Sequence, residues 1–238
     1  MSAAQDSVAG RRIDLWIGGE TIAPGSGAYF DSLNPIDDSV YAQAALGTTD
    51  DMDRAVQTAH AAFAEYKDTV AKEREAWLSR AASLLEEQAD EFADILVDEI
   101  GSSISKARFE IGAAVAILRA AAGSTRMVSG KTMPSDTPGR FSMSVRSPVG
   151  VVAAITPFNV PLSKGVRLTA SPLAFGNTVV LMPSEQAPAL ALRLAKLYAD
   201  AGIPAGAFNV VTGLGHEIGD SLTTVSYTHL RAHETEAY

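Results

Sequence analysis

The stretch "VGVVAAITPFNVPL", Val149 to Leu162, is the most informative part of the chain. Its first half is a continuous apolar run, which is typical of a strand buried on both faces of a sheet. Two prolines, Pro157 and Pro161, then bracket a loop that carries one side-chain amide, Asn159. An asparagine in such a loop usually bonds its own backbone. Taken alone, the stretch predicts a buried strand that ends in a tight turn.

The same kind of pattern continues after this stretch. A helical segment over Leu162–Ala174 leads to "TVVLM" (178–182), a second buried strand. Another helix can begin at Pro188 and end at Gly202, and "AFNVV" (207–211) is a third strand. The order strand-helix-strand-helix-strand with short links predicts a parallel sheet with right-handed crossovers, the doubly wound nucleotide-binding type.

Ligands of such sheets bind beyond the carboxyl ends of the strands, so three loops matter. They are "TPFNVP" (156–161), "PSEQAP" (183–188) and "TGLGHEIG" (212–219). Glu185 can accept hydrogen bonds from a ribose; equally, Ser184 can cap the next helix while Glu185 favours its positive end. The glycine loop has GxGxxxG spacing rather than the GxGxxG dinucleotide fingerprint, and a tight turn explains it better.

The residues before Val149 predict a hairpin and three helices. "DLWIGGETIAP" (14–24) places two glycines between strand-like runs, as a hairpin turn requires. Apolar stripes predict helices over 52–66, from Lys72 to a stop at Gly101, and over 104–118. Thr48 is a candidate N-cap for the first helix. We interpret the stripes as core packing.

A loop and a single strand separate these helices from the sheet. Residues 123–139 lose the helical period and gain Gly, Ser and Pro, so we expect a loop there. "RFSMSVRSP" (140–148) alternates apolar and polar residues, which predicts a half-exposed strand. A strand outside the main sheet can pair with another chain.

Composition narrows the function classes. The chain has 238 residues, a formal net charge of −9 and no cysteine, which excludes disulfides, thiolate metal sites and a cysteine nucleophile within it. The four histidines show no metal-ligand spacing, and no basic stripe indicates nucleic acid. No apolar run approaches the roughly 20 residues of a membrane span, and the start lacks a secretory h-region. We therefore expect a cytoplasmic enzyme or binding protein.

Four motifs together resemble the NAD(P)-dependent aldehyde dehydrogenase superfamily, in order and in spacing. They are "GKTMPSDTPGRFSMSVRSPVG", "GVVAAITPFNVPL", "PLAFGNTVVLMPSEQAP" and "AGIPAGAFNVVTGLGHEIGDSL". The resemblance runs from about Trp16 to Leu222 and covers the amino-terminal part of a family member. It implies an α/β fold: a Rossmann-like parallel-sheet cofactor-binding domain, preceded by a helical segment and a β-strand arm, and incomplete in this chain.

The resemblance also implies a division of the chain into four parts. Residues 1–139 would hold the hairpin and the helical part of the cofactor-binding domain, and 140–148 an oligomerisation-type strand. Residues 149–224 would form the βαβαβ cofactor-binding core. Residues 225–238 match nothing that the family places there and read as translated sequencing-adapter sequence, so we expect a non-native tail.

The implied reaction is oxidation of an aldehyde to a carboxylic acid. In the family a cysteine thiolate attacks the aldehyde, hydride passes to the nicotinamide, and a glutamate-activated water releases the acid. Asn159 matches the amide that donates to the thiohemiacetal oxyanion, where a fixed donor is worth roughly 3–4 kcal/mol. Further matches, all to cofactor-binding positions, are Ile155, Thr156, Pro157, Phe158, Met182, Ser184, Glu185, Gly215 and Gly219.

Two departures from the family pattern bear on specificity. Met182 stands where the family usually has a lysine that contacts the ribose, and methionine cannot donate a hydrogen bond. Glu185 would repel a 2′-phosphate, so NAD is favoured, with NADP as the alternative. Many members carry lysine where Thr169 stands; a small residue there, with Arg167 before it, resembles members that act on aromatic aldehydes.

The catalytic cysteine and the general-base glutamate lie downstream in the family. We therefore expect these 238 residues to be inactive by themselves, and the full-length parent to be a homodimer or homotetramer. Two alternatives stay open. One is a semialdehyde or acylating dehydrogenase of the same superfamily, and the other is a non-catalytic nucleotide-binding or oligomer-forming short protein.

Overall fold

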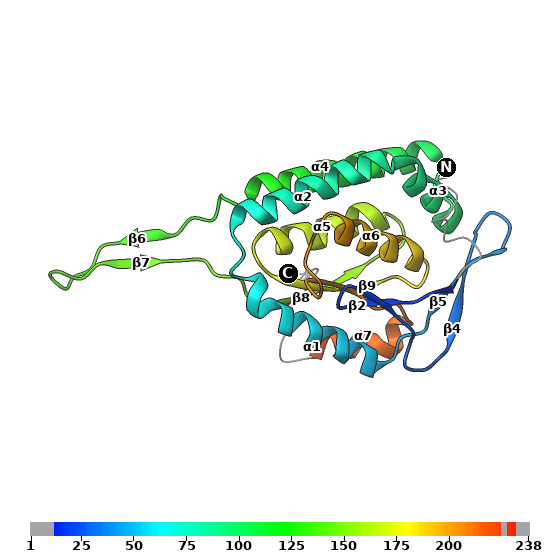
Figure 1. The fold of residues 1–238 in the computed structure, drawn as a ribbon, viewed down its shortest axis with the longest axis horizontal. Helices are drawn as coiled ribbons and strands as arrows, with labels where there is room; N and C mark the ends of the chain where they lie inside the picture. Colours follow the sequence, from blue (N-terminus) through cyan, green and yellow to red (C-terminus); the bar gives the residue numbers. More distant parts are fainter. Residues whose placement is uncertain (1–11, 225–227, 232–238) are drawn as a thin grey trace, which may run out of the picture.

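A six-stranded sheet forms the centre of the protein, in the order β11-β8-β9-β10-β2-β3 (Figure 1). The computed structural model describes residues 12–224 and 228–231. β8 (Val151–Thr156), β9 (Thr178–Pro183) and β10 (Phe208–Val210) run parallel to one another. The parallel sheet expected from the three apolar runs is therefore confirmed.

Helices cover both faces of this sheet, which is why the strand sequences are continuously apolar. α5 (Pro161–Ala174) and α6 (Pro188–Asp200) lie on one face, while α1 (Thr49–Tyr66) and α7 (Gly215–Thr224) lie on the other (Figure 1). Alternate residues of β8 point to opposite faces, as the two-residue period of a strand requires. Val152 and Ala154 join the core with α5 and α6, and Val151 and Ala153 join the core with α1.

The amino-terminal hairpin belongs to the same sheet and makes it mixed. β2 (Leu15–Ile17) pairs antiparallel with β10, and β3 (Glu20–Ile22) forms the edge. Both turn glycines have positive φ, so the predicted hairpin is confirmed. The side chain of buried Asn209 accepts a hydrogen bond from the backbone N–H of Gly18 at 2.9 Å. This bond ties the turn to the sheet.

A smaller sheet was not foreseen. It has the order β1-β5-β4, from β1 (Arg12–Ile13), β4 (Tyr29–Leu33) and β5 (Val40–Ala45). An Asn-Pro dipeptide, Asn34-Pro35, lies between the last two strands and favours a turn. There the Asn34 side chain accepts a hydrogen bond from the N–H of Ile36 at 2.9 Å, which is an Asx-turn.

A third helical layer lies beyond α5 and α6 and consists of α2 (Ala71–Glu87), α3 (Ala89–Ile100) and α4 (Ile104–Ser124) (Figure 1). The expectation of one helix from Lys72 to Gly101 was wrong, because the backbone leaves helical geometry at Gln88. The apolar stripe continues across the break, and periodicity cannot detect a single non-helical residue. Gly101 ends α3 in the left-handed conformation, as predicted.

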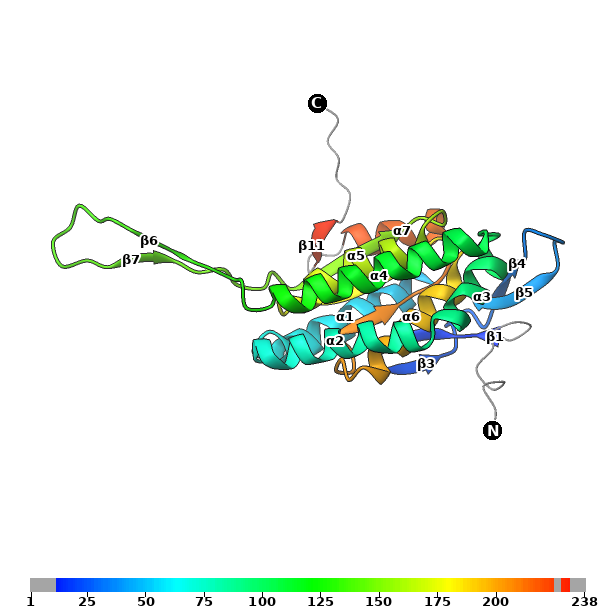
Figure 2. The same ribbon diagram turned by 90° about the horizontal axis from the view of Figure 1, so that it is seen from above.

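A two-stranded arm projects from the body (Figures 1 and 2). β6 (Lys131–Met133) pairs antiparallel with β7 (Ser142–Ser144). The expectation of an unstructured loop over 123–139 was therefore wrong at β6, where three residues find a partner strand that lies outside the loop. The apolar side chains of Phe141, Met143 and Val145 are exposed.

The last described strand, β11 (Thr228–Arg231), pairs parallel with β8 at the edge of the sheet. It lies within the range expected to be a non-native tail; the other positions from 225 to 238 lie outside the described residues. Within the described ranges, no helix is long and apolar enough to cross a membrane.

Candidate functional site

The first two predicted site loops lie side by side at the carboxyl edge of the sheet. The register pairs Ile155 of β8 with Met182 of β9, and Thr156 with Pro183. The backbone N–H of Ser184 donates to the carbonyl oxygen of Thr156 at 3.0 Å. Residues 157–160 and 184–187 therefore begin from neighbouring points, as the carboxyl ends of adjacent parallel strands must.

The loop after β8 presents both apolar and polar groups to the surface. Ile155 is 39% exposed although its strand neighbours are buried, and Phe158 is 49% exposed. Pro157 and Asn159 are exposed as well, whereas Thr156 is buried. No described residue forms a hydrogen bond with the Asn159 side chain, so the amide does not serve its own turn. It is free to meet a bound molecule.

The loop after β9 presents a carboxylate. Glu185 is exposed, and none of the described residues bonds to its side chain. The Ser184 hydroxyl accepts from the N–H of Gln186 at 3.3 Å, which closes the turn. Ser184 does not cap α6, because the N-cap of that helix is Ala187 and Pro188 follows it. The expectation that Ser184 caps this helix is therefore wrong, and the position of Glu185 before the helix start is unaffected by that.

The third loop leads into α7 and packs over Met182. Gly215 is exposed at the start of α7, and Gly219 lies one turn further on, half-buried. A Cβ built on Gly219 would lie 3.7 Å from the Met182 Cε. The Met182 side chain is only 5% exposed and belongs to the core beneath α7, so it offers the edge no polar group.

Packing explains why residue 213 is a glycine. Its φ is +158°, and a Cβ there would lie 2.7 Å from the Ile218 Cδ1 and 3.3 Å from the Gly47 carbonyl oxygen. Packing therefore explains this glycine without a ligand, which supports the turn interpretation for this part of the GxGxxxG spacing.

A buried glutamate caps α5 from another helix. Glu110 of α4 is 2% exposed, and its Oε1 accepts from the backbone N–H groups of Leu162 at 2.9 Å and Ser163 at 3.1 Å. The N-cap residue of α5, Val160, has no side chain able to do this. Burial raises the pKa of Glu110, although these two N–H groups and Lys106, whose Nζ lies 3.7 Å from Oε2, oppose the rise.

A second buried glutamate caps α6 in the same way. Glu99 of α3 is 3% exposed; its Oε1 accepts from the N–H of Ala189 at 2.7 Å, and its Oε2 from the N–H of Leu190 at 3.0 Å. The hydroxyl of Ser32 in β4 adds a third hydrogen bond at 3.2 Å. Burial raises the pKa of Glu99 to about 7, against the effect of these donors.

The sequence reasoning missed both glutamates, although two signals pointed to them. α5 and α6 each begin with proline after an apolar residue that cannot cap, so their N–H groups need acceptors from elsewhere. Glu99 and Glu110 also fall on the buried stripes of their helices, where a carboxylate must find donors.

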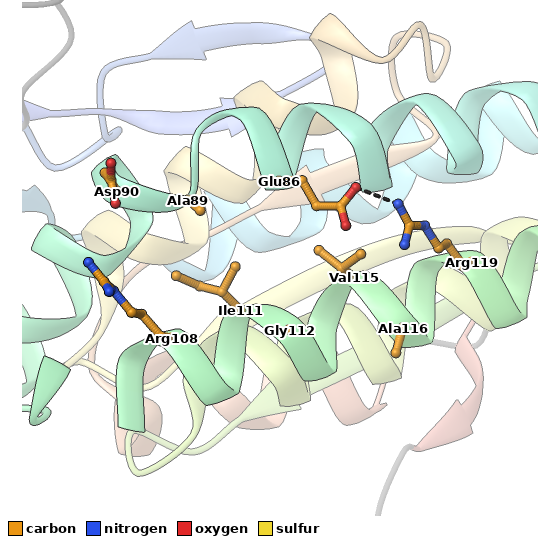
Figure 3. A pocket seen from close by; sticks show the side chains of 9 residues that line it. All are labelled: Glu86, Ala89, Asp90, Arg108, Ile111, Gly112, Val115, Ala116 and Arg119. Carbon is orange, nitrogen blue, oxygen red and sulfur yellow. Dashed lines mark hydrogen bonds and ion pairs between the residues drawn. The ribbon is translucent and has the colours of Figure 1, made fainter. Parts of the chain in front are cut away.

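Other candidate features lie away from this edge. A hollow of about 610 Å³ lies between α2, α3 and α4, and no predicted site residue lines it. Figure 3 shows the side chains that line it, among them the ion pair of Glu86 and Arg119. Thr169 is fully buried in α5, and its hydroxyl lies 2.9 Å from the Tyr198 hydroxyl, so it lines no surface. No group of residues in the described ranges could hold a metal ion.

The sequence of this chain is similar to those of known proteins. The model of the aldehyde dehydrogenase family matches residues 22–230, which extends past Leu222, where the resemblance was expected to stop. A vanillin dehydrogenase of Corynebacterium glutamicum is 40% identical over 209 residues, covering 87% of this chain and 43% of that protein. The chain thus spans less than half the length of this relative.

Solved structures agree with the sequence match. An NAD-dependent benzaldehyde dehydrogenase from Corynebacterium glutamicum superposes with a TM-score of 0.88 and 37% identity, covering 96% of this chain and 49% of that one. An NADP-dependent enzyme of E. coli superposes with a TM-score of 0.89 and 32% identity, covering 91% of this chain and 45% of that one.

Proposed function

This chain belongs to the aldehyde dehydrogenase family, and from that membership we propose that it forms the cofactor-binding part of an enzyme that oxidises an aldehyde to a carboxylic acid with NAD(P). The observation that carries the proposal is the carboxyl edge of the sheet. There, an exposed amide, an exposed carboxylate and exposed apolar side chains extend from adjacent strands.

The residues of this edge fit a nicotinamide dinucleotide. Glu185 has both carboxylate oxygens available to accept from ribose hydroxyls. The exposed side chains of Ile155, Phe158 and Pro157 provide an apolar surface suited to a flat ring, and the buried Thr156 lies beneath them in the strand. Gly215 and Gly219 let the backbone approach a ligand. When bound, the cofactor accepts hydride from the substrate.

NAD is the favoured cofactor and NADP the alternative. The carboxylate of Glu185 would repel a 2′-phosphate, and Met182 places no cation beside it, because its side chain lies in the core. The relatives include both NAD-dependent and NADP-dependent enzymes. Selectivity therefore depends on the residues of this chain, and we propose that Glu185 sets it.

Asn159 is the proposed catalytic residue of this part. Its amide donates a hydrogen bond to the oxyanion that develops when a thiolate attacks the aldehyde. Pro157 and Pro161 restrict the loop, so the donor is in place before reaction begins. The thiolate itself has to come from outside these 238 residues, which contain no cysteine.

An aromatic aldehyde is the proposed substrate class. The support comes from the vanillin and benzaldehyde dehydrogenases among the relatives. Thr169, which first suggested this class, is buried against Tyr198 and adds no support. We also propose that the parent is a cytoplasmic homodimer or homotetramer, in which the exposed arm β6–β7 provides the contact between subunits.

Titration of the purified chain with NAD and with NADP, followed by calorimetry, tests the cofactor assignment. We expect NAD to bind at least about tenfold more tightly, and Glu185→Gln to reduce that difference. Failure of the wild-type chain to bind either dinucleotide would overturn the proposed function.

A further inference from the structure

We propose that Glu110 and Glu99 are positioning residues of the cofactor edge, each fixing one site loop by holding the first turn of the helix that follows it. The inference rests on the proposed function, because it assigns these residues to the same site. Neither glutamate touches the edge itself. Each acts through backbone N–H groups of α5 or α6.

We call Glu110 and Glu99 the anchors. Only a few residues separate the backbone N–H group that each anchor holds from the nearest site residue. Leu162, which donates to Glu110, lies three positions after Asn159. Ala189, which donates to Glu99, lies four positions after Glu185. A proline at the first helical position restricts the backbone in both cases. A hydrogen bond from the N–H of Ala187 to the carbonyl oxygen of Ser184, at 2.9 Å, closes the second loop further. Movement of either first turn would therefore displace the adjoining site residue.

Capping alone does not account for this arrangement. A serine or aspartate at the N-cap would satisfy the same N–H groups at the surface, without the cost of burying a carboxylate. Here the carboxylates come from α3 and α4, in the outer helical layer, and they cross to α6 and α5. Ser32 of β4 also bonds to Glu99, so one group joins three elements. The anchors couple the edge to the rest of the molecule.

The anchors also restrict where phosphate can bind. In doubly wound folds the N-terminus of a helix commonly binds phosphate through its free N–H groups and its positive dipole end. At α5 and α6 those N–H groups already donate to carboxylates of this chain. These N–H groups are therefore not available to a phosphate. The dinucleotide must therefore place its pyrophosphate away from both helix starts.

The affinities of the 238-residue chain for NAD and for AMP distinguish the effect of Glu99 from that of Glu110. Glu99→Gln keeps the shape but turns an N–H donor toward a backbone N–H, and we expect it to weaken both ligands about tenfold, a loss typical of a helix cap. Glu110→Gln should weaken NAD by a similar factor and leave AMP within about twofold, since its loop holds the nicotinamide end in the proposed function. A variant that was merely less stable would lose affinity for NAD and for AMP by the same factor.

Matched controls remove a carboxylate without touching a helix start. Asp98→Asn lies beside Glu99 on α3, and Glu86→Gln removes one partner of an exposed ion pair. Both should bind NAD and AMP as the wild type does. Ser32→Ala serves if Glu99→Gln does not fold; it removes one of three donors, and AMP binding should weaken about twofold to threefold.

The outcomes distinguish the two proposals. Absence of NAD binding by the wild type would overturn the proposed function. A wild type that binds NAD, with Glu99→Gln and Glu110→Gln unchanged or with both ligands weakened equally by Glu110→Gln, would overturn the anchoring inference alone. Weakened AMP binding in Glu99→Gln but not in Glu110→Gln would support it.

Discussion

At the scale of single residues, two buried carboxylates and one exposed amide differ in burial and in hydrogen bonding. Asn159 is exposed and its side chain bonds to no described residue, so it is available for the role proposed for it. Glu99 and Glu110 are almost fully buried and bond to backbone N–H groups. Their contribution is structural first, and it reaches the site only through helix positions.

Replacement of Asn159 by alanine should leave stability unchanged and affect only chemistry. We expect the free energy of unfolding to stay within about 0.5 kcal/mol, because no described hydrogen bond is lost. In the full-length parent, kcat should fall about 10²-fold to 10³-fold. Chemical denaturation and steady-state kinetics measure the two effects.

Asn209→Ala is the matched control for an amide with a structural role. Asn209 accepts from Gly18 at 2.9 Å and donates to the Gly206 carbonyl oxygen at 2.8 Å, and it is buried. Its loss should cost about 1–3 kcal/mol of stability. Equal destabilisation by the two replacements would contradict the division of roles.

Glu99 should give the protein a distinct dependence of stability on pH. Its pKa rises from 4.5 to about 7 on folding, so between these values the folded state binds more protons than the unfolded state. This contribution is present below pH 4.5 and is lost as the pH rises through 7. The loss is on the order of 3 kcal/mol, from about 1.4 kcal/mol per pKa unit.

Denaturation of the wild type and of Glu99→Gln between pH 4.5 and 8 measures this effect. We expect the stability of the wild type, relative to the variant, to fall across that range. Asp98, the neighbour of Glu99 in the sequence, also has a pKa raised by burial, so Asp98→Asn is the appropriate control. The buried Tyr41 near Glu99 also has a raised pKa, and its phenol stays neutral in this pH range. A constant difference between wild type and Glu99→Gln would refute the assignment.

At the scale of elements, the arm β6–β7 differs from every packed element. It projects from the body (Figure 2), and its apolar side chains Phe141, Met143 and Val145 are exposed. An exposed strand with apolar side chains is a surface on which another chain can pair. The arm therefore contributes little to the stability of one chain and suits contact between chains.

Replacement of Phe141, Met143 and Val145 together by threonine tests this contact. We expect the unfolding free energy of the isolated chain to change by less than about 0.5 kcal/mol, as for other surface positions. In the full-length parent the same change should shift sedimentation toward smaller species. A parent that keeps its assembly after the replacement would show that the arm is not the contact.

At the scale of the whole molecule, the sheet has two unpaired edges among the described strands, β11 and β3. Apolar residues are also exposed at the carboxyl edge, where Ile155 and Phe158 lie. These surfaces favour association, and the chain spans less than half the length of its vanillin dehydrogenase relative. The isolated 238 residues thus combine the proposed cofactor-binding edge with uncovered apolar surface.

We expect the isolated chain to associate and to oxidise no aldehyde. Without cysteine no covalent intermediate forms, so NADH should not appear when vanillin or benzaldehyde is added with NAD. Light scattering and absorbance at the NADH band measure the two properties. A monomeric chain would contradict the first expectation, and any turnover would contradict the second.

The sequence by itself determined the parallel strands, their helices and the loops at their carboxyl ends. Apolar runs, proline starts and glycine stops are local signals, and local signals predict local structure. The hairpin turn at Gly18 and the end of α3 at Gly101 were likewise readable, because positive φ strongly favours glycine.

Only the tertiary structure decided which distant groups complete those elements. The pairing of β2 with β10, the strand partner of β6 and the caps of α5 and α6 all join residues far apart in the sequence. Hydrogen bonds of this kind depend on where folding places each donor and acceptor, and no periodicity records it. For the same reason Met182 and Thr169, which the sequence associated with ligands, lie in the core, while Asn159 and Glu185 remain exposed.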